Sequence, residues 1–151
     1  MRIVDVCYLK KNINERIASS PWFLVEQSLI NEFANITGDE QWIHIDPVRA
    51  KKESPYKSTI AHGYLLVSLI PQFAQQSYSI EGVTTKINYG LNKVRFIQAV
   101  KPDQKIRAHF FIEEYQEIEN GSFKLEVRVE IEIASIKKLA CVANTVVLCI
   151  S

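Results

Sequence analysis

Residues 63–77 read GYLLVSLIPQFAQQS, and they are apolar around most of a helical circumference. A helix that is apolar nearly all round is normally buried at the centre of a domain. Pro71 lies inside this stretch, where it is expected to kink the helix or to free a carbonyl group near Val67; the alternative is that the helix breaks there. We therefore predict a buried central helix that needs a surrounding layer of other elements.

The surrounding layer is predicted from the part of the chain after Gly82, where apolar and polar residues alternate. Residues 123–133, FKLEVRVEIEI, alternate most clearly, and Asn120-Gly121 before them is a strong hairpin signal. Further strands are expected over residues 86–91, 93–100, 106–113 and 139–150. Alternation of this kind is typical of an antiparallel sheet with one dry and one wet face. The predicted fold class is α+β, a curved antiparallel sheet wrapped around a central helix.

Two shorter helices are expected before the central one. Apolar residues recur at three- and four-residue spacing over residues 25–37, and Gly38 stands where a left-handed C-terminal cap belongs. Asp46-Pro47 has the form of an N-cap followed by a first-turn proline, which predicts a helix over residues 48–52.

Two strands carry further expectations. Both faces of residues 139–150 are mostly apolar, and self-association would cover such a face, so we predict a homodimer. In residues 106–113, His109 alternates with charged neighbours and is expected on a solvated face.

Composition limits the function. The 151 residues carry 18 Lys plus Arg and 17 Asp plus Glu, a formal net charge of +1. This length fits a single domain over residues 1–151, and the near-neutral charge argues against nucleic acid or a membrane surface as partner. The sequence lacks a secretory signal and a stretch of ~20 apolar residues that could cross a bilayer. The three cysteines form no paired motif and are expected to be buried thiols. We predict a soluble, cytoplasmic protein.

Titratable side chains gather in residues 37–46, TGDEQWIHID, directly after a predicted helix. The carboxylate of Asp39 and the imidazole of His44 could reach one water and divide acid and base duties between them. The carboxylate is also expected to fix the tautomer of His44 and to raise its pKa. The structural alternative is that Asp39 caps a turn and His44 packs against a backbone carbonyl group.

Residues 58–64, STIAHGY, lie at the start of the central helix. Gly63 would let a ligand approach the backbone closely, and free amides there could hold a partially negative oxygen, such as that of a thioester enolate. The structural alternatives are that Gly63 permits tight packing of helix on sheet and that His62 is a hydrogen-bonded structural residue.

These motifs together resemble the signature of the MaoC-like, (R)-specific enoyl-CoA hydratases. The matching residues are FANITGD at 33–39, HID at 44–46 and IAHG at 60–63. Residues 87–96, INYGLNKVRF, are similar to a strand of the nodulation-protein-N-like branch, which also tends to have Gln-Trp-Ile-His at the place of residues 41–44.

The resemblance implies a hotdog fold, usually dimeric with two sheets joined edge to edge. It also implies reversible syn addition of water to the trans-2 double bond of an acyl-CoA, without a metal or another cofactor. Asp39 and His44 would activate the water as the catalytic pair, with the assignment of acid and base left open. The backbone at Gly63 would receive the thioester oxygen, and His62 and Gln41 would also bind substrate.

Gln41 and Trp42 replace the asparagine and proline of the wider signature. The Gln41 amide could still orient Asp39 or the substrate, whereas Trp42 is expected to loosen the loop and to affect the size of the substrate.

Other functions stay open. The same fold hosts acyl-CoA thioesterases, in which Asp39 would aim a water at the thioester. A non-catalytic acyl-thioester-binding protein would keep the pocket and the dimer without turnover. The thioester could also belong to an acyl carrier protein, which is acidic and would bind to a basic rim. The candidate residues for this rim are Lys51, Lys52, Lys57, Lys93, Arg95 and Lys101. The structural alternative is that these residues form an ordinary solvated face.

Overall fold

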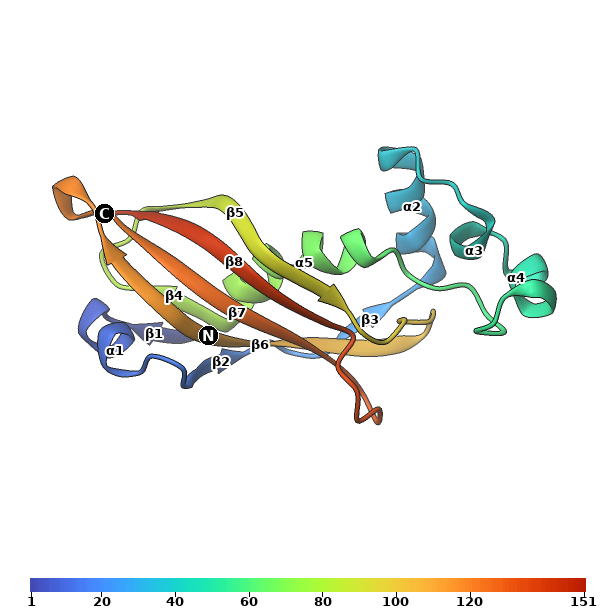
Figure 1. The fold of residues 1–151 in the computed structure, drawn as a ribbon, viewed down its shortest axis with the longest axis horizontal. Coiled ribbons are helices and arrows are strands. Elements are labelled where there is room, and N and C mark those ends of the chain that lie inside the picture. Colours follow the sequence, from blue (N-terminus) through green and yellow to red (C-terminus); the bar gives the residue numbers. More distant parts are fainter.

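A six-stranded antiparallel sheet forms the body of the protein in the computed structural model, which describes residues 1–151 (Figure 1). The order of its strands is β2-β6-β7-β8-β5, and β3 also pairs with β6. The bounds are Arg16–Ser19 for β2, Phe23–Val25 for β3, Thr85–Phe96 for β5, Gln104–Glu117 for β6, Phe123–Ile133 for β7 and Cys141–Ile150 for β8. A separate parallel pair joins β1 (Arg2–Val4) to β4 (Tyr78–Ile80).

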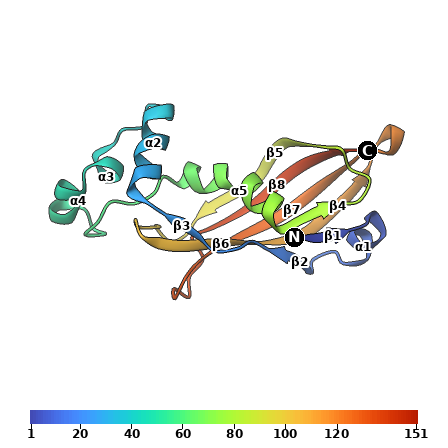
Figure 2. The same cartoon turned by 180° about the vertical axis from the view of Figure 1, so that it is seen from behind.

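Helix α5 (Gly63–Ser77) lies along one face of this sheet, in front of it in Figure 2. It buries Leu66 and Phe73 in the core, and it continues through Pro71 without a break. From the sheet, β7 contributes every second residue of its alternating pattern to the same core. The predicted α+β arrangement, a helix packed on an antiparallel sheet, is confirmed.

Four shorter helices complete the fold: α1 (Val6–Lys11), α2 (Gln27–Thr37), α3 (Trp42–Ile45) and α4 (Pro47–Glu53). The last three extend together beyond one end of the sheet (Figure 1). As predicted, Gly38 caps α2 in the left-handed conformation with φ 75°, and the Asp46 carboxylate accepts a hydrogen bond from the Arg49 amide at 2.9 Å. The predicted helix over 25–37 starts too early, because Val25 pairs with Gln104 in the sheet.

The strands differ from the prediction at the sheet edge. Residues 86–91 and 93–100 were expected as two strands, but β5 runs unbroken to Phe96, with register shifts near Tyr89 and Asn92. The apolar strand β8 is internal, between β7 and β5. The sheet therefore has one free edge at β5, and the other edge is formed by β2 and β3. The predicted Asn120-Gly121 turn is confirmed, with φ 61° and 77° at its two residues.

Two predictions about side chains are wrong. His109 does face away from the core, but it is only 7% exposed. Its Nε2 donates to the Glu132 carboxylate, and its Nδ1 shares a hydrogen bond with the Ser19 hydroxyl, each at 2.7 Å. Among the cysteines, Cys141 and Cys149 are buried, whereas Cys7 is exposed. None of the helices is long and apolar enough to span a membrane.

Candidate active site

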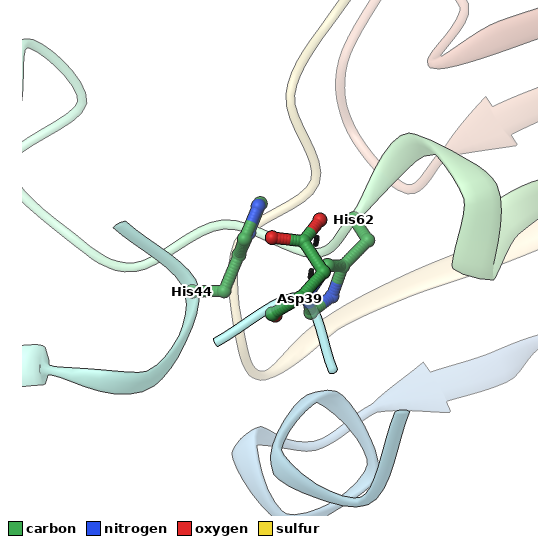
Figure 3. A group of neighbouring side chains, drawn as sticks. All are labelled: Asp39, His44 and His62. Carbon is green, nitrogen blue, oxygen red and sulfur yellow. Dashed lines mark hydrogen bonds and ion pairs between the residues drawn. The ribbon is translucent and has the colours of Figure 1, made fainter. Parts of the chain in front are cut away.

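Asp39, His44 and His62 converge where the α2–α4 segment meets the start of α5 (Figure 3). One polar atom from each of the three side chains lies within 4.8 Å of the others. Asp39 comes from the loop after α2, His44 from the single helical turn α3, and His62 from the residue before α5. His44 therefore lies in a short helical turn.

The ring of His44 has a defined tautomer. Its Nδ1 donates to the carbonyl group of Ile60 at 2.7 Å, because a carbonyl oxygen only accepts hydrogen bonds. The lone pair of the neutral ring is therefore on Nε2. Burial lowers the pKa of His44, and the charge of His62 lowers it further, against the opposing effects of the Ile60 carbonyl and Asp39. The expected rise in this pKa is wrong, because desolvation outweighs the carboxylate. A neutral imidazole with a free Nε2 is suited to accept a proton.

A glutamine that the sequence did not single out fixes the backbone of His44. The Gln27 side chain donates to the His44 carbonyl at 2.7 Å and to Asn31 at 2.9 Å. The buried hydroxyl of Thr59 donates in turn to the Gln27 carbonyl oxygen. These bonds tie α2, α3 and the segment before α5 together. A polar residue in the first turn of a helix is common, so the sequence offered no distinctive signal for Gln27.

His62 lies beneath the predicted pair and does not face solvent. Its Nε2 donates to the backbone carbonyl of Asp39 at 2.9 Å, and the Asp39 Oδ2 lies 3.9 Å away. Its ring stacks on that of His44, with centroids 3.7 Å apart. His62 is only 3% exposed, so its side chain presents almost no surface to a ligand.

The geometry of the two histidines does not suit a shared metal ion. Their rings are stacked at an interplanar angle of 23°, and imidazole lone pairs lie in the ring planes. Two rings stacked with their centroids 3.7 Å apart do not direct their in-plane lone pairs at one ion about 2 Å from each nitrogen.

The start of α5 offers free donors. The amides of Gly63 and Tyr64 donate to no backbone or side-chain acceptor of the chain, while the Leu65 amide turns back to the His62 carbonyl at 3.1 Å. Free amides at the N-terminus of a 15-residue helix favour a partial negative charge. Gly63 also has a packing role, since a Cβ there would stand 2.8 Å from three ring atoms of Phe96.

The two residues that depart from the wider signature have different environments. Gln41 is exposed, and its side chain makes no hydrogen bond to Asp39, so the predicted orienting contact is absent. Its backbone carbonyl instead accepts the His44 amide at 2.9 Å. The Trp42 ring lies 4.4 Å below the Arg49 guanidinium, which fixes α3 against α4 rather than loosening the loop.

Two cavities flank the start and the body of α5. A cavity of about 190 Å³ borders Gly63 and Phe96. A larger one, of about 490 Å³, lies between α5 and β5 and is mostly apolar, with Val67, Ala74 and Leu91 in its lining.

The family model described as "MaoC like domain" matches residues 9–134. The chain belongs to the MaoC-like family. It is 40% identical to "3-hydroxyacyl-thioester dehydratase Z" of Mycobacterium tuberculosis, over 95% of this chain and 94% of that protein. It is 34% identical to "Nodulation protein N" of Rhizobium leguminosarum bv. viciae, over 95% and 90% of the two chains.

The fold of this MaoC-like chain is also similar to that of a solved hydratase. The "(R)-hydratase from A. caviae involved in PHA biosynthesis" superposes with a TM-score of 0.70 at 19% identity, over 87% of this chain and 93% of that one. The hotdog fold implied by the sequence motifs is therefore confirmed.

Proposed function

We propose that this MaoC-like chain is a 3-hydroxyacyl-thioester dehydratase that also adds water to trans-2-enoyl thioesters, as an (R)-specific enoyl-CoA hydratase does. The observation that carries the proposal is the free Nε2 of His44 beside the Asp39 carboxylate, next to the free amides that start α5. A relative that is 40% identical and named for this reaction supports the assignment.

The proposed mechanism begins with a water held between Asp39 and His44. His44 Nε2 takes a proton from this water while its oxygen bonds to the β-carbon of the substrate. The electrons of the double bond move toward the thioester oxygen, where the amides of Gly63 and Tyr64 stabilise the charge. The protonated His44 then returns its proton to the α-carbon, so the ring ends neutral. One residue acting on one face of the double bond accounts for syn addition, and Asp39 orients the water and offsets the charge on the ring.

The substrate is proposed to be an acyl thioester of CoA or of a carrier protein. The 490 Å³ cavity beside α5 has an apolar lining suited to an acyl chain. Gln41 is exposed at the same loop and remains a candidate for contact with the thioester arm. Basic residues on α4 and on the adjoining loop, among them Lys51, Lys52 and Lys57, could meet the phosphates of either carrier.

The test is loss of enoyl-thioester absorbance with crotonyl-CoA and a series of longer trans-2-enoyl-CoAs. We expect turnover by the wild type and a loss of at least 100-fold in Asp39→Asn and His44→Gln, the range in which general acid–base catalysis contributes. A parallel assay with a thiol reagent detects free CoA. Release of thiol without hydration would indicate a thioesterase, and tight acyl-CoA binding without either reaction would indicate a binding protein.

We also propose a homodimer formed through the free edge of β5. Nearly all of this strand is exposed, including Tyr89 at 66% and Leu91 at 48%, and an unpaired strand edge is a template for pairing with another chain. Tyr89→Lys with Leu91→Lys is expected to halve the mass in light scattering. Ile118→Lys, at an exposed apolar residue away from β5, serves as the control. Unchanged mass in the double variant would refute this interface.

The cytoplasm is the proposed compartment. The three free cysteines, two of them buried, fit a reducing environment.

A further inference from the structure

His62 contacts both members of the proposed catalytic pair, although it lies almost wholly out of solvent. One nitrogen holds the backbone of Asp39 at 2.9 Å, and one ring face covers His44 with centroids 3.7 Å apart. The Phe33 ring lies 5.1 Å from the His62 ring, so α2 also packs against it. The imidazole therefore links the loop after α2, the turn α3 and the start of α5.

Asp39 has few other anchors. It follows Gly38, the left-handed cap of α2, on a segment without regular structure. Its amide makes one long hydrogen bond, 3.4 Å, to the Thr37 hydroxyl, and its side chain accepts none within the chain. The bond from His62 to the Asp39 carbonyl is thus the short hydrogen bond that fixes this backbone.

The second ring nitrogen of His62 has an unusual environment. Nδ1 is buried and has no hydrogen-bond partner, which is uncommon for a polar atom inside a protein. A purely structural site would favour a phenyl ring or a histidine with both nitrogens bonded. The His62 imidazole instead leaves one nitrogen unpaired. We take this to indicate that its other two features are needed at this position: the N–H donor at Nε2 and the flat face of the ring.

We infer that His62 is a positioning residue for hydration, which sets the distance between Asp39 and His44 and supports the His44 ring by stacking. This inference rests on the proposed function. His62 does not reach the substrate, because it is only 3% exposed. Its two tasks are separable, because the donor contacts Asp39 and the ring face contacts His44.

Two substitutions separate these tasks. His62→Gln places an amide N–H near the position of Nε2 and so keeps the bond to Asp39 but removes the ring. His62→Phe keeps a ring against His44 and Phe33 but removes the donor. His109→Gln is the matched control, since His109 is also a buried histidine with side-chain hydrogen bonds but lies on the outer face of the sheet.

The readouts are kcat, KM and the pH dependence of kcat/KM for enoyl-CoA hydration, with thermal unfolding measured alongside. We expect His62→Phe to lower kcat at least tenfold, His62→Gln to lower it less, and both to change KM by less than about twofold. The groups that face His44 are His62 and Asp39, and the charge of His62 lowers the pKa of His44. Both variants should therefore move the acid limb of the profile to higher pH. His109→Gln should lose stability but keep kcat and the acid limb.

The outcomes are distinct. A wild-type protein without hydratase activity refutes the proposed function itself. An active wild type with kcat and acid limb unchanged in both His62 variants overturns the inference about His62. The inference is also overturned if His109→Gln lowers kcat as much as the His62 variants do at an equal loss of stability, and the His62 variants do not shift the acid limb.

Discussion

Replacing Gly63 with alanine separates two roles of this residue: packing against Phe96, and leaving room for the thioester oxygen at the free amides. Gly63 does not have a positive φ, so its backbone conformation does not require glycine. The new Cβ would stand 2.8 Å from three ring atoms of Phe96, and the ring must move because carbon atoms do not pack that closely. The same Cβ would also stand beside the free amides where the thioester oxygen is proposed to bind.

The two effects differ in magnitude. Overpacking costs about 1–3 kcal/mol, and the better helix propensity of alanine offsets up to about 1 kcal/mol. The net loss of about 0–3 kcal/mol corresponds to a fall in Tm of up to about 12 °C for a chain of this length. If the Cβ displaces the thioester oxygen, kcat should fall by about 100-fold, as on loss of one oxyanion-hole donor.

The double variant with Phe96→Ala removes the clash and leaves the Cβ in place. The assay measures Tm by thermal unfolding and kcat/KM with crotonyl-CoA for three proteins: Gly63→Ala, Phe96→Ala and the double variant. Adding Gly63→Ala to Phe96→Ala should leave Tm nearly unchanged but still lower kcat/KM at least tenfold. If kcat/KM instead stays within about threefold of Phe96→Ala alone, Gly63 serves packing only, and the proposed oxyanion site is wrong.

Three further predictions concern the cavity, the base and the outer face of the sheet. Ala74→Trp fills part of the 490 Å³ cavity, so turnover of enoyl-CoAs of eight or more carbons should fall while turnover of crotonyl-CoA persists. An equal fall in turnover for all chain lengths would contradict an acyl-chain site in this cavity. The acid limb of kcat/KM should lie below pH 6.5, because burial lowers the pKa of His44 and hydration needs its neutral ring, and a limb above pH 7 would refute His44 as the base. The pKa of Glu132 is lowered in the folded protein, chiefly by the hydrogen bond from Arg107. The ionised Glu132 carboxylate therefore stabilises the fold above its unfolded pKa near 4.5, and this stabilisation is lost as the pH falls through the lower pKa of the folded state. Glu132→Gln should thus lower Tm at pH 7, by an amount that shrinks below pH 4.5. The control Glu119→Gln, at an exposed carboxylate without an ion-pair partner, should leave Tm unchanged. A loss of Tm in Glu132→Gln that is the same at every pH would contradict the link between the pKa of Glu132 and stability.

Much of the fold could be predicted from local pattern. The alternation in β7 and the apolar circumference of α5 each follow from the period of one element, and both are confirmed. Short elements with few residues, such as β3 and α3, were missed, because a three- or four-residue segment carries no period. The unbroken β5 was predicted as two strands, because a register shift near Asn92 interrupts the alternation without ending the strand.

The candidate site was predictable in its members but not in their roles. The motifs singled out Asp39 and His44, and the structure brings them together. They also singled out His62, but its burial beneath His44 depends on contacts between segments 18 residues apart in sequence or more, which no local pattern contains.

The sequence by itself determined the elements, the family motifs and the concentration of acid and base groups in residues 37–46. Tertiary structure alone decided the protonation geometry of the site: the Ile60 carbonyl sets the tautomer of His44, and burial lowers its pKa. The physical reason is that hydrophobic periodicity is a property of neighbouring residues, whereas desolvation and hydrogen bonding depend on which distant segments are folded against a side chain.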